Sequence, residues 1–292
     1  MPILNLQMLL NGRYHNSTSA VLNIQNRAFV YGDIISETLH ACAGRLCFFD
    51  AHIKNLVQAM QIAQMNVPQK FLSETEVFKN EISKMLVKNK IFKGANVRIS
   101  VFRSFSEGFE PDNDNTEYSV SIQPLNQTGF EFNRQGLAVA IYDKHRKYPT
   151  PLCGFDTHEN CFLKMAALKF PYKDKVNDVL LLNAEGNLVE SVLNGNVFIV
   201  KNKTIYTPML EDGCAKDIMR ERVLEVARNA GYGVFGDKHL SLDHLKQADE
   251  IFFASTQNGV NWVGAFQTRR FYKTVSQDIA TKINDLYLNF QE

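Results

Sequence analysis

Two short polar turns in the second half of the chain constrain its fold most strongly. Ala184-Glu185-Gly186-Asn187 separates the strand-like segments 179–183 and 188–192, and Asn202-Lys203 separates the next two such segments. A chain that reverses over so few residues lays consecutive strands antiparallel, because a parallel pair needs a long crossover. We therefore predict a sheet built largely from hairpins here. The other strand-like segments of this half are 137–142, 197–200, 204–207 and 250–254.

The first part of the chain has the pattern of helices followed by strands. Apolar spacing predicts one helix from Asp50, as its N-cap, to about Met65, and another after the capping-box pattern Ser73-x-x-Glu76. Residues 97–101 and 118–122 alternate between apolar and polar side chains, as half-buried strands do. The mixture of helices and antiparallel strands predicts the α+β fold class.

A polar stretch divides the chain into two predicted lobes. Residues 123–135 contain Pro124 and Gly129, and we predict that they link a small N-terminal lobe, 1–122, to a larger C-terminal lobe, 136–292. The C-terminal lobe is also expected to hold helices at about 216–230 and from about 276 onward.

Composition excludes several kinds of partner. The net charge of the 292 residues is +1, so nothing indicates nucleic acid or an anionic membrane surface. Residues 1–11 lack the basic start of a signal peptide, and no apolar run approaches the length of a membrane span. The five cysteines form no C-x-x-C pattern, which favours reduced thiols over disulfides or a zinc site. We expect a cytoplasmic protein with no metal site and no membrane or nucleic-acid partner.

Six motifs follow one another between Asn26 and Thr256. They are Asn26-Arg27-Ala28-Phe29-Val30-Tyr31-Gly32-Asp33 with Glu37-Thr38; Asp50-Ala51-His52-Ile53-Lys54-Asn55-Leu56; Gly186-Asn187-Leu188-Val189-Glu190; Gly195-Asn196-Val197-Phe198; Thr207-Pro208 with 212–220; and 250–256. In order and spacing the chain resembles the pyridoxal-phosphate (PLP) enzymes of fold type IV, which include branched-chain and D-amino-acid aminotransferases and aminodeoxychorismate lyases. The resemblance implies a D-amino-acid aminotransferase-like, two-lobed fold with a pseudo-barrel in the larger lobe. It also implies PLP between the lobes and a homodimer whose subunits both contribute to each site.

The lysine that bonds to PLP in this family has no counterpart. The family segment K-T-x-x-N resembles Asp156-Thr157-His158-Glu159-Asn160, so Asp156 stands at the lysine position. A carboxylate cannot form a Schiff base with an aldehyde. Lys147 precedes this loop and Lys164 lies about one turn into the following helix. Either would be a displaced Schiff-base lysine only in a moved pocket.

The resemblance also implies that contacts to the PLP phosphate are replaced. The arginine of the family motif H-x-x-R-L is Asn55, which loses a bidentate guanidinium. In the motif G-I-T-R the glycine is Asp217, the isoleucine is Ile218 and the threonine is Met219. A carboxylate at Asp217 suits the start of a helix but repels a phosphate there. Thr256 remains as a hydroxyl donor.

Glu190 matches the family partner of the pyridine nitrogen, which it keeps protonated. On the residues alone, an exposed strand glutamate is an equal alternative. Tyr31 is either a pocket residue or an aromatic that only packs. Asp156, Asp217 and Glu190 together are expected to bring three carboxylates near one cavity, which would then prefer neutral or cationic molecules to phosphorylated ones.

These replacements predict a homologue of class IV aminotransferases that has lost Schiff-base PLP chemistry. It would carry no PLP, have no assigned catalytic residue, and bind another small molecule in the interlobe cleft or a partner protein. One alternative is an active aminotransferase or 4-amino-4-deoxychorismate lyase that uses PLP and a displaced lysine such as Lys164. Another is a structural dimer partner of an active paralogue.

Overall fold

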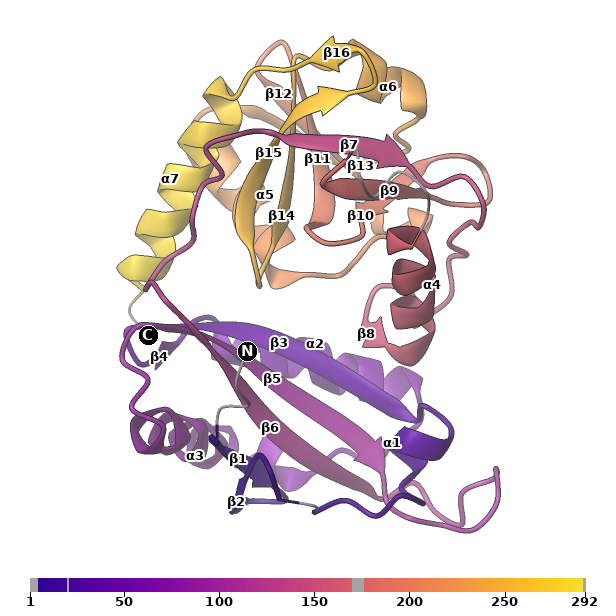
Figure 1. Cartoon of the computed structure of the whole chain (residues 1–292), viewed down its shortest axis with the longest axis vertical. Helices are drawn as coiled ribbons and strands as arrows, with labels where there is room; N and C mark the ends of the chain where they lie inside the picture. The colour runs from indigo at the N-terminus through magenta and orange to yellow at the C-terminus, as the bar shows by residue number, and fades with distance from the viewer. Residues whose placement is uncertain (1–4, 20, 170–175, 291–292) are drawn as a thin grey trace. The chain divides into compact units, whose positions relative to one another are not determined.

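The computed structural model describes residues 5–19, 21–169 and 176–290, which form two compact units (Figure 1). Unit 1 comprises Met1–Gly129 and Phe155–His158, and unit 2 comprises Phe130–Gly154 and Glu159–Glu292. The first boundary, after Gly129, lies within the stretch 123–135 that the sequence predicts as a linker. The return of Phe155–His158 to the N-terminal unit was not expected from the sequence.

The N-terminal unit is built on an antiparallel sheet with the strand order β2-β1-β6-β5-β3-β4. Its strands are β1 (Gln7–Leu10), β2 (Arg13–Asn16), β3 (Ile34–Cys42), β4 (Arg45–Leu46), β5 (Gly94–Arg103) and β6 (Thr116–Leu125). The short strand β8 (Asp156–Thr157) pairs with β3 at Ser36 and Ile35. This pairing explains why the segment belongs to the N-terminal unit. β6 also extends into the predicted linker, because its ladder with β5 continues to Leu125.

The helices of this unit begin differently from the sequence-based expectation. They are α1 (Arg27–Val30), α2 (Phe49–Ile62), η1 (Gln69–Phe71) and α3 (Thr75–Lys88). Asp50 is not the cap of α2, because Phe48 takes that place with a left-handed backbone (φ 54°) and Asp50 lies in the first turn. The capping box at Ser73 is also wrong: α3 begins after Glu74, and no side chain caps it.

The C-terminal unit contains a sheet whose strands close into a ring. Its order is β10-β9-β7-β15-β14-β11-β12-β13, and an additional pairing of β10 with β11 closes the first six strands. The strands are β7 (Leu137–Ile141), β9 (Asp178–Leu182), β10 (Leu188–Ser191), β11 (Gly195–Lys201), β12 (Thr204–Pro208), β13 (Gly233–Lys238), β14 (Glu250–Ser255), β15 (Gly259–Phe266) and β16 (Arg269–Arg270). The helices are α4 (His158–Leu168), η2 (Leu210–Asp212), α5 (Ile218–Asn229), α6 (Leu242–Gln247) and α7 (Thr274–Leu288).

Both hairpins predicted from the polar turns are confirmed. β9 and β10 pair antiparallel, and so do β11 and β12. Asn202 and Lys203 both have positive φ (49° and 59°), as the two central residues of a type I′ turn require. The turn geometry therefore matches the twist of the strands that it joins.

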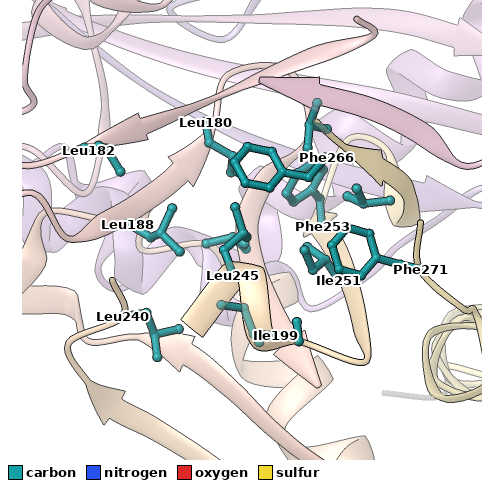
Figure 2. Close-up of a cluster of buried hydrophobic side chains, with 14 residues drawn as sticks. Leu180, Leu182, Leu188, Ile199, Leu240, Leu245, Ile251, Phe253, Phe266 and Phe271 are labelled. Atoms are coloured by element: carbon teal, nitrogen blue, oxygen red, sulfur yellow. The ribbon is translucent and has the colours of Figure 1, made fainter. Parts of the chain in front are cut away.

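Alternation along β11 and β14 places apolar side chains on both faces of the ring. Figure 2 shows the larger cluster, in which Ile199, Ile251 and Phe253 meet Leu245 from α6. On the opposite face Phe198 and Phe252 stack in parallel, with ring centroids 4.8 Å apart. A one-residue shift of register would exchange the side chains of the two faces and so disrupt the packing of both. No helix in the described ranges is long and apolar enough to cross a bilayer.

The fully buried Phe253 allows a test of this core. We expect Phe253→Ala to lower the free energy of unfolding by about 3–5 kcal/mol, because the lost ring leaves a cavity. Urea denaturation followed by circular dichroism measures the change. Phe92→Ala is the matched control, because Phe92 is 65% exposed. An equal loss in both variants would contradict the assigned core.

Candidate functional site

Asp156 lies in a partly exposed ion pair within the N-terminal unit. Its backbone pairs with Ser36 of β3, and Arg98 of β5 donates from Nη1 to Asp156 Oδ2 at 2.9 Å. The exposed fractions of the Arg98 and Asp156 side chains are 45% and 44%. The position matched to the Schiff-base lysine therefore holds a solvated acid–base pair and offers no amine.

Asn55 belongs to a buried cluster around Glu37. Glu37 lies on β3, and its two carboxylate oxygens meet His52 Nδ1 at 2.6 Å and Asn55 Nδ2 at 2.9 Å, both from α2. All three residues are buried. The Asn55 amide is thus directed at an internal carboxylate. The contact of His52 with Glu37 joins α2 to β3.

Tyr31 lies at the end of α1 in a surface organised by Arg27. The Arg27 guanidinium donates to the backbone oxygens of Gly108 and Phe109, and it lies 4.9 Å from the centre of the Tyr31 ring. Tyr31 also packs edge-on against Phe109, with ring centroids 5.5 Å apart. The exposed apolar residues of α1 and the adjoining loop form what we call the α1 aromatic surface: Phe29, Val30, Tyr31, Phe105 and Phe109.

Glu190 lies on β10 at the centre of a buried ion cluster in the C-terminal unit. Its Oε1 accepts a hydrogen bond from Lys147 Nζ at 2.7 Å, and Lys164 Nζ lies 3.5 Å from the same oxygen. Glu190 is fully buried and Lys147 nearly so, whereas the Lys164 side chain is 32% exposed. The alternative of an exposed strand glutamate is therefore wrong.

The two lysines control the charge of Glu190. Burial alone would raise the pKa of its carboxyl, but the ammonium groups of Lys147 and Lys164 outweigh burial and hold the pKa below its ordinary value of 4.5. The second oxygen, Oε2, and both polar side-chain atoms of the cross-strand neighbour Asn196 are buried without a hydrogen-bond partner among the residues that the structure describes. One oxygen of Glu190 therefore faces both lysines, and the other retains unused hydrogen-bonding capacity.

The pairing of Lys147 with Glu190 escaped the sequence analysis because 43 residues separate them. Lys147 follows β7, and its backbone N–H donates to Leu182 O at 2.9 Å at the end of β9. β10 pairs with β9, so this contact brings the lysine near Glu190. The residues around a lysine that follows one strand do not indicate which residue on another strand will bind it.

Asp217 is the N-cap of α5, and its carboxylate takes three hydrogen bonds. Met219 N and Thr256 Oγ1 donate to Oδ1 at 2.8 and 2.6 Å, and Thr256 N donates to Oδ2 at 3.1 Å. Thr256 follows β14, so the carboxylate joins a helix start to a strand end. The side chains of Ile218 and Met219 are buried, and at this position Met219 contributes only its backbone N–H.

Each of the three carboxylates therefore has its own partner. Asp156 binds Arg98, Glu190 binds two lysines, and Asp217 binds N–H and hydroxyl donors. Asp156 also belongs to a different unit from the other two. The sequence analysis did not foresee these partners, because they lie far along the chain from the carboxylates that they bind. Across the described ranges, no three His, Cys, Asp or Glu side chains are arranged to hold a metal ion.

Comparison with known proteins agrees with this fold. Residues 35–264 match the family described as amino-transferase class IV. The aminodeoxychorismate lyase of Bacillus subtilis (strain 168) is 27% identical over 255 residues, covering 85% of this chain and 82% of the relative. A putative branched-chain-amino-acid aminotransferase of Methanocaldococcus jannaschii is 25% identical over 256 residues, covering 86% of this chain and 84% of the relative. The solved branched-chain aminotransferase of Thermoproteus uzoniensis superposes with a TM-score of 0.88 at 20% identity, covering 98% of this chain and 96% of that one.

The ion cluster predicts a pH dependence of stability. Since the folded state holds the pKa of Glu190 below 4.5, its ionised form stabilises the fold above about pH 4.5, and this stabilisation is lost as the pH falls through the folded pKa. We expect the free energy of unfolding of the wild type to fall more steeply than that of Glu190→Gln between about pH 5 and pH 3. Urea titrations across this range measure both slopes.

Glu185→Gln is the control, since Glu185 lies exposed in the hairpin before β10. Its acid dependence should follow that of the wild type. Parallel slopes for the wild type and Glu190→Gln would show that the lysines do not depress the Glu190 pKa.

Proposed function

The chain belongs to the class IV aminotransferase family, and from this membership we propose that it is a homologue that has lost Schiff-base PLP chemistry and binds another small molecule or partner. The predicted fold, α+β of PLP fold type IV, is confirmed by the solved branched-chain aminotransferases that superpose on it. The activity named for the relatives does not follow from the fold alone.

The observation that carries the proposal is the binding of both candidate lysines to Glu190. The ring nitrogen and the aldehyde of PLP lie on opposite sides of the pyridine ring. In the family resemblance Glu190 is the partner of the nitrogen. An amine bound to Glu190 therefore stands where the nitrogen would lie and away from the aldehyde. Lys147, at 2.7 Å and almost fully buried, is poorly placed to replace the missing lysine.

The phosphate end also does not fit PLP. Asn55 is directed at Glu37, so no guanidinium fork is available at that position. Asp217 places a negative charge on the donors at the start of α5. A phosphate dianion at this helix end would meet that charge at close range. We therefore assign no reaction step to PLP in this chain.

The alternative function depends on Lys164. Its side chain is partly exposed, and its Nζ is farther from Glu190 than that of Lys147. An active aminotransferase or aminodeoxychorismate lyase would need this amine to leave Glu190 and reach an aldehyde. A purely structural role beside an active paralogue requires no amine at all.

A reduction experiment distinguishes these functions. We expect the purified protein, mixed with PLP, to show no absorbance band of a protonated Schiff base, because the Nζ atoms of Lys147 and Lys164 both lie against Glu190 Oε1. Sodium borohydride should then fix no pyridoxyl group, as checked by peptide mass mapping. A pyridoxyl group on Lys164 or Lys147, absent from the corresponding Lys→Arg variant, would establish the displaced-lysine enzyme.

We further propose that the ligand binds between the lobes of a homodimer in the cytoplasm. No disulfide joins the cysteines of the described residues, which is consistent with a reducing compartment. The α1 aromatic surface supports a second copy as partner, because Phe29 and Phe109 are 74% and 80% exposed. Tyr31 and Phe109 are in contact, and exposed apolar side chains that gather in this way mark interaction sites in soluble proteins.

Light scattering tests the dimer. We expect the wild type at micromolar concentration to have twice the mass of one chain, and Phe109→Asp to shift toward the monomer because a charge in an apolar interface is costly. Phe92→Asp changes an exposed phenylalanine (65%) outside the α1 aromatic surface and should remain dimeric. A monomeric wild type, or equal effects of both substitutions, would contradict the assigned interface.

A further inference from the structure

We infer that Lys147 and Asp217 are built-in substitutes for two charges that a PLP molecule would bring. The ammonium of Lys147 takes the place of the ring nitrogen at Glu190, and the carboxylate of Asp217 takes the place of the phosphate at the start of α5. The chain thereby meets one oxygen of Glu190 and the donors at the start of α5 with its own side chains, and we expect it to fold without a cofactor.

The first substitution follows from the burial of Glu190. A fully buried carboxylate without a cation is strongly destabilising, so Glu190 requires a positive partner. Lys147 supplies one at 2.7 Å. Its backbone is fixed by the hydrogen bond to Leu182 O and by a β-bridge to Asn183, so the ammonium is held in place. An external cationic ring nitrogen would have to share the carboxylate with this ammonium.

The second substitution follows from the number and origin of the donors on Asp217. An ordinary N-cap aspartate accepts from the first turn of its own helix, as Asp217 does from Met219 N. Here Thr256 adds a backbone N–H and a hydroxyl from a different element, after β14. Donors from a helix start and a strand end that converge on one anion are what a bound oxyanion would use.

Asp217 therefore closes a latent oxyanion site. While its carboxylate is present, an incoming phosphate finds these donors occupied and meets a like charge. Without the carboxylate, the same donors would face an unfilled space with the positive end of the twelve-residue helix α5 behind them. This inference deepens the proposed function, since it explains the exclusion of phosphorylated ligands. It involves only contacts within the C-terminal unit.

The test for Asp217 uses inorganic phosphate and thermal unfolding of the full chain. Asp217→Gly should still fold, because glycine is tolerated at an N-cap. We expect phosphate to raise its melting temperature by a few degrees in a saturable way, and to leave the wild type unchanged, relative to sodium chloride at equal ionic strength. Ser241→Gly removes the N-cap of α6 and is the matched control, with no response to phosphate expected.

Two outcomes would overturn the assignment of Asp217. A phosphate response in the wild type equal to that of Asp217→Gly would show that the carboxylate does not close the site. No response in Asp217→Gly would show that the donors form no oxyanion site. Asp217→Asn keeps a side-chain oxygen that can cap α5 but removes the charge. We expect phosphate to raise its melting temperature by less than that of Asp217→Gly. This variant provides the test if the glycine variant folds poorly.

Lys147→Met tests the other substitute. It should lower the melting temperature markedly, whereas Lys144→Met, at an exposed position nearby, should not. The double variant Lys147→Met/Glu190→Gln should regain most of the loss, because the buried charge is then gone. If Lys147→Met and Lys144→Met lowered the melting temperature equally, the role of Lys147 would be refuted. None of these measurements involves a Schiff base, so their failure and the failure of the proposed function are distinguishable.

Discussion

The buried ion pair between Lys147 and Glu190 is the constraint on which the rest of the C-terminal unit depends. Glu190 lies on β10, the strand that closes the ring of the sheet by pairing with both β9 and β11. A charge at that closing strand must be compensated, since an unpaired buried charge costs about 3–5 kcal/mol. Lys147 therefore joins the loop after β7 to the ring, and Lys164 joins α4 to the same carboxylate.

Several other positions of the chain show the same feature, a polar side chain bound by another residue of the same chain. At Asn55, Asp156, Glu190 and Asp217, where the family resemblance places cofactor contacts, the side chain binds another part of the same chain. Asn55 and His52 share Glu37, Asp156 binds Arg98, and Asp217 binds Thr256. Loss of a cofactor from a protein normally leaves buried polar groups unsatisfied. Here several of them are satisfied internally. Among the described residues, Glu190 Oε2 and the polar atoms of its cross-strand neighbour Asn196 are buried without a hydrogen-bond partner, and so is His52 Nε2.

Features set by neighbouring residues could be predicted from the sequence, and features set by distant residues could not. The turn at Asn202-Lys203 was predictable because asparagine tolerates the positive φ that the turn requires. The start of α2 was not, because the left-handed Phe48 follows from the hairpin packed before it rather than from any capping preference. Asp217 could be recognised as an acid at a helix start, but its second partner, Thr256, required the tertiary structure. The contacts of Lys147 and Lys164 with Glu190 could not be predicted for the same reason.

The two-residue strand β8 also has a consequence for how the chain is made. Its pairing with β3 means that the N-terminal unit is completed by residues that follow Gly129 in the sequence. During synthesis, the edge of β3 at Ile35 and Ser36 emerges long before its partner and displays unpaired backbone groups until Asp156 and Thr157 follow. The nascent chain therefore carries an open strand edge while the first strand of the other unit, β7, is being added. A fragment that ends at the unit boundary would keep that edge permanently, so the first unit reaches its full hydrogen bonding only as part of the longer polypeptide.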